Sequence, residues 1–272
     1  NIHLDHKTFQ VGNRKYYIGQ KLKESDLFTF YNGYLDLGEI YGEIIIKLVN
    51  NSKDNQLIQN EIRILDYLYS KPVPQRKHLP VFLNHFEVGT KKGIILRKIS
   101  GYNFREISKY YPQGIDQKHM IWMLDRLLSL FGYIHSQGII HGHLSPSHTI
   151  IRPNNHNAFI LGWGNAMFHN ELKGRKFNSE SIFMAPELKN GGVIGPWSDI
   201  YSIGKLMIFI LNGNLETNEL PNSVEPKICK LLQSMVQLNP QNRPQDAWDL
   251  HEQQTIIKDS LWERKFLNFV IN

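Results

Sequence analysis

The chain has 272 residues, which is enough for one large domain or for two lobes that each bury a core. Its hydrophobic content of 41% and charged content of 21% are those of an ordinary globular protein. The longest apolar run, residues 200–211, is interrupted by Tyr, Ser, Gly and Lys, so a membrane span of about 18 apolar residues is excluded. The net charge of +6 is modest, and we do not expect nucleic acid as a partner.

Two features of the sequence bear on its compartment. The single cysteine, Cys229, excludes an intrachain disulfide and is typical of a reducing environment, so we expect a cytoplasmic protein. The first residues have neither an initiator Met nor the pattern of a signal peptide. We therefore expect a domain taken from a longer chain.

The first part of the chain is rich in predicted strands. Residues 7–19, 28–35 and 41–49 are β-branched and aromatic runs separated by Gly and Asn, which predicts antiparallel hairpins. Residues 57–69 carry apolar side chains at helical spacing, which predicts one amphipathic helix. Residues 82–99 predict a further hairpin that turns between Gly89 and Gly93.

The second part is helical. Residues 117–138 predict a long helix with Gly138 at its C-terminal end, and residues 197–213 predict a buried helix that ends before Gly213. Amphipathic helices are predicted within 224–238 and 244–258. Strands followed by helices indicate an α+β protein with two lobes, residues 1–99 and 100–272, joined near 99–103.

Four short segments carry the most specific information. They are IIIK at residues 44–47, IIHGHLSPSHTII at 139–151, AFILGWGNA at 158–166, and MAPE at 184–187. In this order and spacing they resemble the V-A-I-K strand, the H-R-D-L-x-x-x-N loop, the D-F-G loop and the A-P-E end of the activation segment in protein kinases. The resemblance extends from Tyr17 to about His251. It implies a bilobal protein-kinase-like fold, with an antiparallel-sheet N-lobe that contains one main helix and a mostly helical C-lobe.

The chain departs from this family at the positions that carry its chemistry. Gly142 stands at the Arg position of H-R-D, and His143 stands where the family has its catalytic Asp. His148 replaces the metal-binding Asn, and Gly162 replaces the metal-binding Asp. Imidazole is a poor ligand for Mg²⁺, which prefers hard oxygens. We therefore expect no bound metal, no cofactor and no enzyme, that is, a pseudokinase; zinc held by these histidines with His141 is disfavoured.

The nucleotide-binding positions of the N-lobe are also altered. The positions of the three glycines in the phosphate-binding loop are filled by Lys23, Ser25 and Phe28. Lys47 and Glu61 match the lysine and helix glutamate that pair in the family, and we expect this pair to be kept as a vestige. Ile45 stands where a small Ala packs against adenine. We therefore expect ATP to bind weakly or not at all.

Three residues match positions that brace the C-lobe. Glu187 ends the MAPE motif, Arg243 matches the arginine that pairs with that glutamate, and Asp199 matches the aspartate that anchors the catalytic loop. The resemblance implies a buried ion pair between Glu187 and Arg243, and hydrogen bonds from the backbone near 141–143 to Asp199.

The expected function is a catalytically inactive binding, scaffolding or regulatory module. Its partner would be another protein or an adjacent domain of the same parent chain. The alternative is an enzyme that performs non-standard nucleotide-dependent transfer in the kinase cleft, with Lys47, Glu61 and His143 as its working groups. A nucleic-acid-binding role is a weaker third reading.

Overall fold

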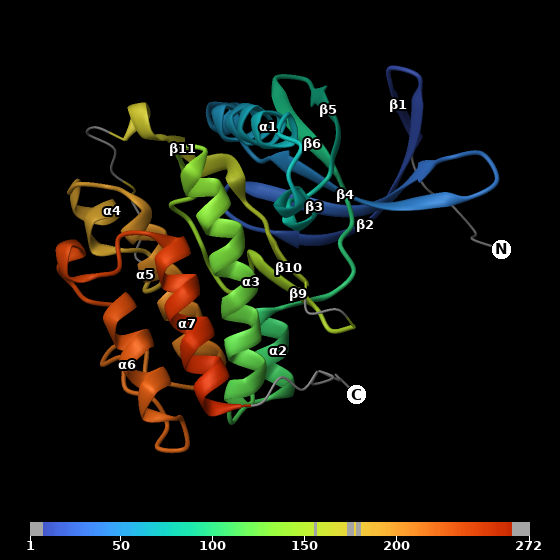
Figure 1. The fold of residues 1–272 in the computed structure, drawn as a ribbon. Coiled ribbons are helices and arrows are strands. Elements are labelled where there is room, and N and C mark those ends of the chain that lie inside the picture. Colours follow the sequence, from blue (N-terminus) through green and yellow to red (C-terminus); the bar gives the residue numbers. More distant parts are fainter. Residues whose placement is uncertain (1–7, 155–156, 173–176, 178–180, 263–272) are drawn as a thin grey trace. The chain divides into compact units, whose positions relative to one another are not determined.

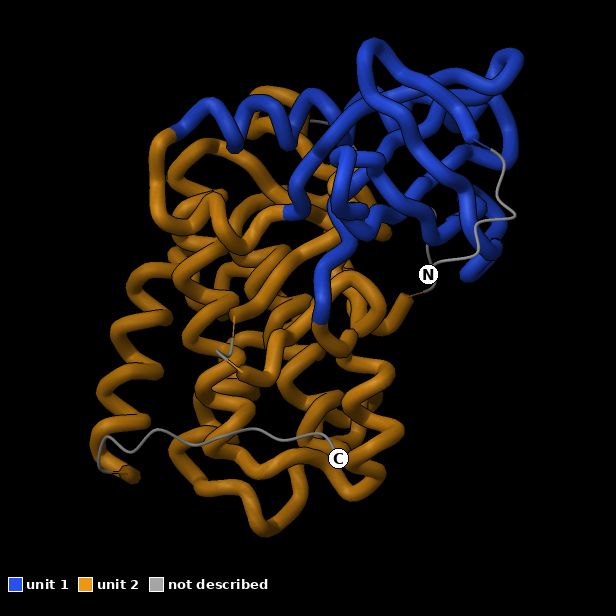
Figure 2. The backbone as a smooth tube through the Cα atoms, turned by 90° about the vertical axis from the view of Figure 1, so that its right-hand side faces the viewer, with its two compact units in different colours: residues 1–71, 80–100 blue, residues 72–79, 101–272 orange. Residues whose placement is uncertain are grey.

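The structure is a computed structural model, and it describes residues 8–154, 157–172, 177 and 181–262. The chain divides into two compact units. The first comprises residues 1–71 and 80–100, and the second comprises residues 72–79 and 101–272 (Figure 2). Within the described residues, no helix combines the length and the apolar character that crossing a membrane requires.

The first unit contains a six-stranded antiparallel sheet and one main helix (Figure 1). The strands are β1 (Thr8–Val11), β2 (Arg14–Glu24), β3 (Phe28–Asp36), β4 (Tyr41–Val49), β5 (Phe82–Val88) and β6 (Lys91–Arg97), in the order β1-β2-β3-β4-β6-β5. The short 3₁₀ helix η1 (Ser52–Asp54) precedes helix α1 (Asn55–Tyr69). All the strands and the helix predicted from sequence in this part are present.

The sheet of the first unit curls so that its edge strands β1 and β5 meet. The rings of Phe9 and Phe86 lie 5.5 Å apart, and the Arg14 guanidinium donates a hydrogen bond of 3.1 Å to the Leu83 carbonyl. The curled sheet encloses a core that contains Tyr16, Leu35, Ile44, Ile46 and Ile95. Helix α1 packs against β5 and β6 through its buried face, formed by Ile58, Glu61, Ile64, Leu65 and Leu68.

The second unit is mostly helical. Its helices are α2 (Phe104–Tyr110), α3 (Gln117–Ser136), α4 (Pro186–Asn190), α5 (Pro196–Ile210), α6 (Pro226–Met235) and α7 (Ala247–Leu261). Its short strands are β7 (Tyr102–Asn103), β8 (Ile139–Ile140), β9 (Thr149–Arg152), β10 (Asn157–Ile160) and β11 (Met167–Phe168). Its 3₁₀ helices are η2 (Pro74–His78), η3 (Trp163–Asn165), η4 (His169–Glu171) and η5 (Pro240–Asn242). Helix α3 packs against α5 and α7 and also contacts β8 and β10.

The predicted fold class is confirmed: an antiparallel sheet with one main helix is followed by a mostly helical part. The chain leaves α3 through Gly138, whose φ of +72° suits a residue without a side chain. Residues 72–79 belong to the second unit, although we expected residues 1–99 to form one lobe. There the buried His78 ring bonds to the Ala158 carbonyl in β10 at 2.8 Å.

Candidate functional site

Lys47 and Glu61 form a buried ion pair inside the first unit. Lys47 lies on β4 opposite Phe30 of β3 and Ile94 of β6, and Glu61 lies on the buried face of α1. The Lys47 Nζ atom is 2.6 Å from Glu61 Oε2, and the two side chains are only 7% and 1% exposed. The pair joins the helix to the middle of the sheet.

A third group, not anticipated from the sequence, completes the surroundings of Lys47. The ring of Phe28, at the start of β3, lies 4.0 Å from the Lys47 ammonium, within the range of a cation–π contact. Ile45, two residues before Lys47 on β4, is partly buried opposite Asn32 and Leu96. Lys23 and Ser25 lie at the end of β2 and in the turn that precedes Phe28. The positions of the family's loop glycines therefore belong to a compact hairpin.

Asp199 anchors the loop that follows β8 in the second unit. The carboxylate is fully buried in the first turn of α5. It accepts hydrogen bonds from the backbone N–H groups of His141 (2.9 Å) and Gly142 (2.8 Å), and from Nε2 of His135 (3.0 Å). Gly142 has φ +70°, and a Cβ there would lie 3.1 Å from the Met167 side chain. Glycine therefore suits the backbone at this position, where the family pattern has Arg.

His141 is held as a neutral ring. Its Nε2 atom donates to the Leu161 carbonyl at 3.1 Å, and its Nδ1 atom accepts from the backbone N–H of His143 at 3.3 Å. Burial lowers the pKa of His141 to about 4. Its ring packs edge-on against Trp163, with centroids 4.7 Å apart, and the Trp163 indole donates to the Ile160 carbonyl at 2.8 Å. Both ends of the 141–163 segment are thereby fixed to each other.

His143 and His148 lie together next to Gly162. Their ring centroids are 5.1 Å apart, and Nδ1 of His148 donates to the His143 carbonyl at 2.9 Å. Gly162 has φ +80°, and a Cβ at this position would lie 3.0 Å from Cε1 and Nε2 of His148. The structure therefore brings together the three positions at which the family has its catalytic Asp and its two metal ligands. The His148 ring lies against the position that a Gly162 side chain would occupy.

The donor set of this loop does not fit Mg²⁺. Residues 139–168 contain no Asp or Glu, and Gly162 offers no side chain. Both nitrogens of His141 already bond to the backbone. In the part of the chain that the structure describes, no group of three or more His, Cys, Asp or Glu side chains is arranged to hold a metal ion.

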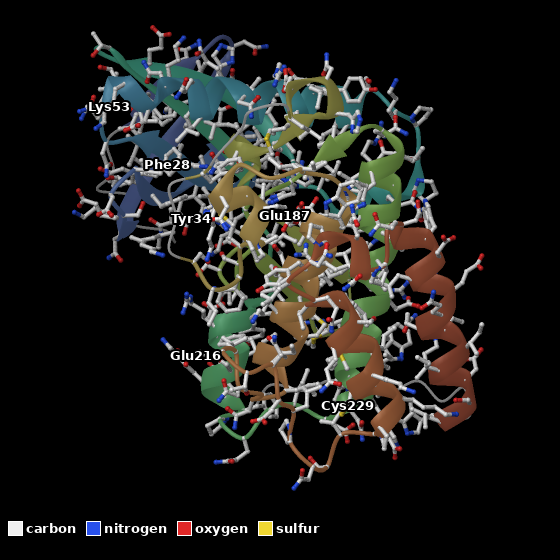
Figure 3. All side chains as sticks on the ribbon, turned by 90° about the vertical axis from the view of Figure 1, so that its left-hand side faces the viewer. Phe28, Tyr34, Lys53, Glu187, Glu216 and Cys229 are labelled. Carbon is white, nitrogen blue, oxygen red and sulfur yellow. The ribbon has the colours of Figure 1, made fainter. Side chains whose placement is uncertain are left out.

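Glu187 and Arg243 form the second buried ion pair. Arg243 Nη1 and Nη2 donate to the two oxygens of Glu187 at 2.7 and 3.0 Å, a bidentate arrangement, and the side chains are 0% and 4% exposed. Glu187, labelled in Figure 3, comes from the first turn of α4. Ser198 also donates to this carboxylate at 2.7 Å, and the Tyr201 ring lies 4.7 Å from the guanidinium carbon. The sequence indicated the pair but not the contributions of Ser198 and Tyr201.

Comparison with known proteins gives a consistent answer. The model of the protein kinase domain family matches residues 41–256. A protein from Synechocystis sp. named serine/threonine-protein kinase D is 24% identical over 228 residues, which cover 75% of this chain and 43% of that protein. A rice protein (Oryza sativa subsp. japonica) named probable serine/threonine-protein kinase WNK6 is 29% identical over 170 residues, covering 61% of this chain and 37% of that protein. The chain thus spans less than half the length of these relatives.

These findings correct one expectation. From the sequence we expected that the chain is not an enzyme. The comparisons show that this expectation is wrong, because the matched relatives are named serine/threonine-protein kinases. The expectation rested on four substituted positions in two loops. The match, in contrast, extends over 41–256 and includes both buried ion pairs. The chain therefore belongs to the protein kinase family.

Proposed function

We propose that this protein kinase domain acts as a binding and regulatory module, whose partner is another protein or an adjacent domain of the same parent chain. The observation that carries the proposal is a contrast within the second unit. The bracing groups Glu187, Arg243 and Asp199 make their full sets of hydrogen bonds, while residues 139–168 contain no Asp or Glu with which to hold Mg²⁺. Binding needs the braced surface and does not need the metal.

Two further observations support this proposal. In the relatives from Synechocystis and rice, the matched region makes up 43% and 37% of the protein, which suits a domain that works together with attached segments. The chain has a single cysteine, Cys229, which suits the reducing environment of the cytoplasm. The partner that we propose is a protein, and neither a membrane nor a nucleic acid.

The test compares two variants of this 272-residue chain. Lys47→Met removes the ammonium that kinases direct at phosphate, whereas Arg243→Met disturbs the brace of the second unit. Lys47→Met leaves Glu61 buried without its counter-charge, so circular dichroism first checks that this variant is folded. If the domain acts by binding, the folded Lys47→Met variant keeps its affinity for the adjacent domain, and Arg243→Met weakens it. The affinity is measured by calorimetry with the separately purified neighbouring segment. An interaction that requires Lys47 and added Mg²⁺–ATP would contradict the proposal.

A second candidate is favoured by the names of the relatives and by the buried Lys47–Glu61 pair. This candidate is a nucleotide-dependent transferase of non-standard chemistry, with His143 as a proton acceptor. Its test is transfer of labelled phosphate from ATP with Mg²⁺ or Mn²⁺. Transfer that falls at least about 100-fold in both Lys47→Met and His143→Ala would support this candidate. Transfer that is unchanged by both substitutions would refute it.

A further inference from the structure

A cavity of about 480 Å³ lies in the second unit beside helix α6, which is labelled in Figure 1. Its apolar wall is formed by Leu220, Pro221, Val224 and Pro226. Each proline fixes its own φ angle, so this wall loses little conformational freedom when a ligand binds. The volume lies within the roughly 300–1,000 Å³ that is usual for small-molecule sites.

The other wall of the cavity is one side of α6. Positions 226, 229, 230 and 233 follow the i, i+3, i+4, i+7 spacing of a single helix side. Lys227 and Lys230 are the charged residues that line the cavity, and both are exposed. The Lys227 ammonium donates to the Ser260 hydroxyl at 3.0 Å. Lys230 forms no ion pair within the described part of the chain, so its ammonium is available to an anion.

The lining contains no group that would oppose this anion. No Asp or Glu is among the residues that line the cavity. Glu225 immediately precedes α6, but it is not part of the lining, and its backbone N–H donates to the Gln117 side chain at 2.8 Å. The cavity therefore combines apolar surface with positive charge.

Cys229, labelled in Figure 3, gives the cavity a thiol that can report on its occupancy. The sulfur lies 3.6 Å from the Val224 carbonyl, and burial raises the pKa of the thiol. A protonated thiol behaves as a small apolar group and is alkylated slowly. Because the chain has one cysteine, alkylation of a thiol reads this cavity alone.

We propose that this cavity binds a small aliphatic carboxylate, whose hydrocarbon chain lies against the apolar wall and whose carboxylate is held by Lys230. The apolar wall selects the hydrocarbon body. Lys227 is already engaged by Ser260, so one available ammonium matches a single negative charge. The site lies wholly within the second unit and goes beyond the proposed function, because no protein partner takes part.

The experiment measures the binding of octanoate to the whole chain by calorimetry. We expect octanoate to bind at least about tenfold more tightly than butanoate, because each fully buried methylene contributes about fourfold in affinity. Octyltrimethylammonium carries a chain of the same length with a positive charge, and we expect it to bind at least about fivefold more weakly than octanoate. Equal binding of the two would indicate detergent-like adsorption and contradict the proposal.

Lys230→Gln removes the ammonium and keeps a residue of similar helix propensity, so the exposed surface of α6 stays folded. We expect the affinity for octanoate to fall about two- to fivefold, the contribution of an exposed charge pair. Lys109→Gln, at an exposed lysine in the last turn of α2, is the matched control and should leave the affinity unchanged. Octanoate should also slow the alkylation of Cys229 by iodoacetamide, whereas butanoate at the same concentration should not.

Any of three results would overturn the proposal. The first is no measurable binding of octanoate to the wild type. The second is the same affinity for octanoate in Lys230→Gln and Lys109→Gln. The third is binding by calorimetry without any slowing of Cys229 alkylation, which would place octanoate elsewhere on the chain.

Discussion

Arg243 offers the sharpest test of what holds the second unit together. Replacing it with Met keeps much of the aliphatic stem but removes five hydrogen bonds: two to Glu187, and one each to the carbonyls of Gln237, Trp197 and Leu238. Glu187 is only 6% exposed in the structure, and Ser198 would remain as a hydroxyl donor to its carboxylate. The variant therefore leaves a carboxylate out of water without its counter-charge.

The expected loss in the free energy of unfolding is about 3–5 kcal/mol, the range for breaking one partner of a buried ion pair. This is a large part of the roughly 5–15 kcal/mol that holds a typical domain folded. The exposed pair between Lys98 and Glu43 is the matched control, since its distance is also 2.7 Å but its side chains are 41% and 52% exposed. Lys98→Met should cost only about 0–1 kcal/mol, because water and salt screen an exposed pair.

The assay is urea unfolding followed by two signals. All five tryptophans lie beyond residue 100, so their fluorescence reports on the second unit, while circular dichroism follows the whole chain. We expect Arg243→Met to lower the midpoint without changing the slope. Glu187→Gln combined with Arg243→Met should cost less than the sum of the two single changes, by roughly 0.5–3 kcal/mol. If Arg243→Met costs no more than Lys98→Met, the buried pair is not what braces this unit.

Two other perturbations test the loop between β8 and η3. His141 binds a proton at about pH 4 in the folded chain and near 6.5 when unfolded, so stability should fall as the pH drops from 6.5 to 4, by about 1.4 kcal/mol per pH unit. Subtracting the profile of His141→Asn isolates this contribution, and identical slopes in both proteins would contradict it. Gly162→Asp should destabilise the fold by about 1–3 kcal/mol, because its Cβ would meet the His148 ring at 3.0 Å. Adding His148→Asn should recover part of that loss, and purely additive effects in thermal unfolding would show that the two positions are independent.

Most elements of the fold follow from periodicity in the sequence. The apolar residues recur over enough positions to predict the six strands of the first unit and the helices α1, α3, α5, α6 and α7. Helix α2 was missed because it has only seven residues, although Asn103 and Glu106 form a capping box whose pattern is visible in the sequence. The two-residue strands of the second unit carry no periodicity at all, and tertiary packing alone decides them.

In the candidate site, too, some contacts could be predicted from the sequence and others could not. The spacing of Lys47 and Glu61 and the motif around Glu187 pointed to pairs that the structure contains. The contact between Phe28 and Lys47 could not be predicted from the sequence. It depends on the conformation of one turn, which is held by Asn50, the residue that follows β4. Sequence patterns indicate which residues share an element, but they do not specify how a turn directs its side chain.

Two departures from the kinase pattern, at His148 and Phe28, are packed against other positions of that pattern. The His148 ring lies against the space that a side chain at Gly162 would need, and the Phe28 ring lies on the ammonium of Lys47. At these two places, restoring one family residue alone creates a clash with His148 or leaves Lys47 covered by Phe28. Any attempt to rebuild a standard magnesium–nucleotide site must then change residues in contacting sets: positions 148 and 162 together in the second unit, and position 28 together with its anchor at Asn50 in the first.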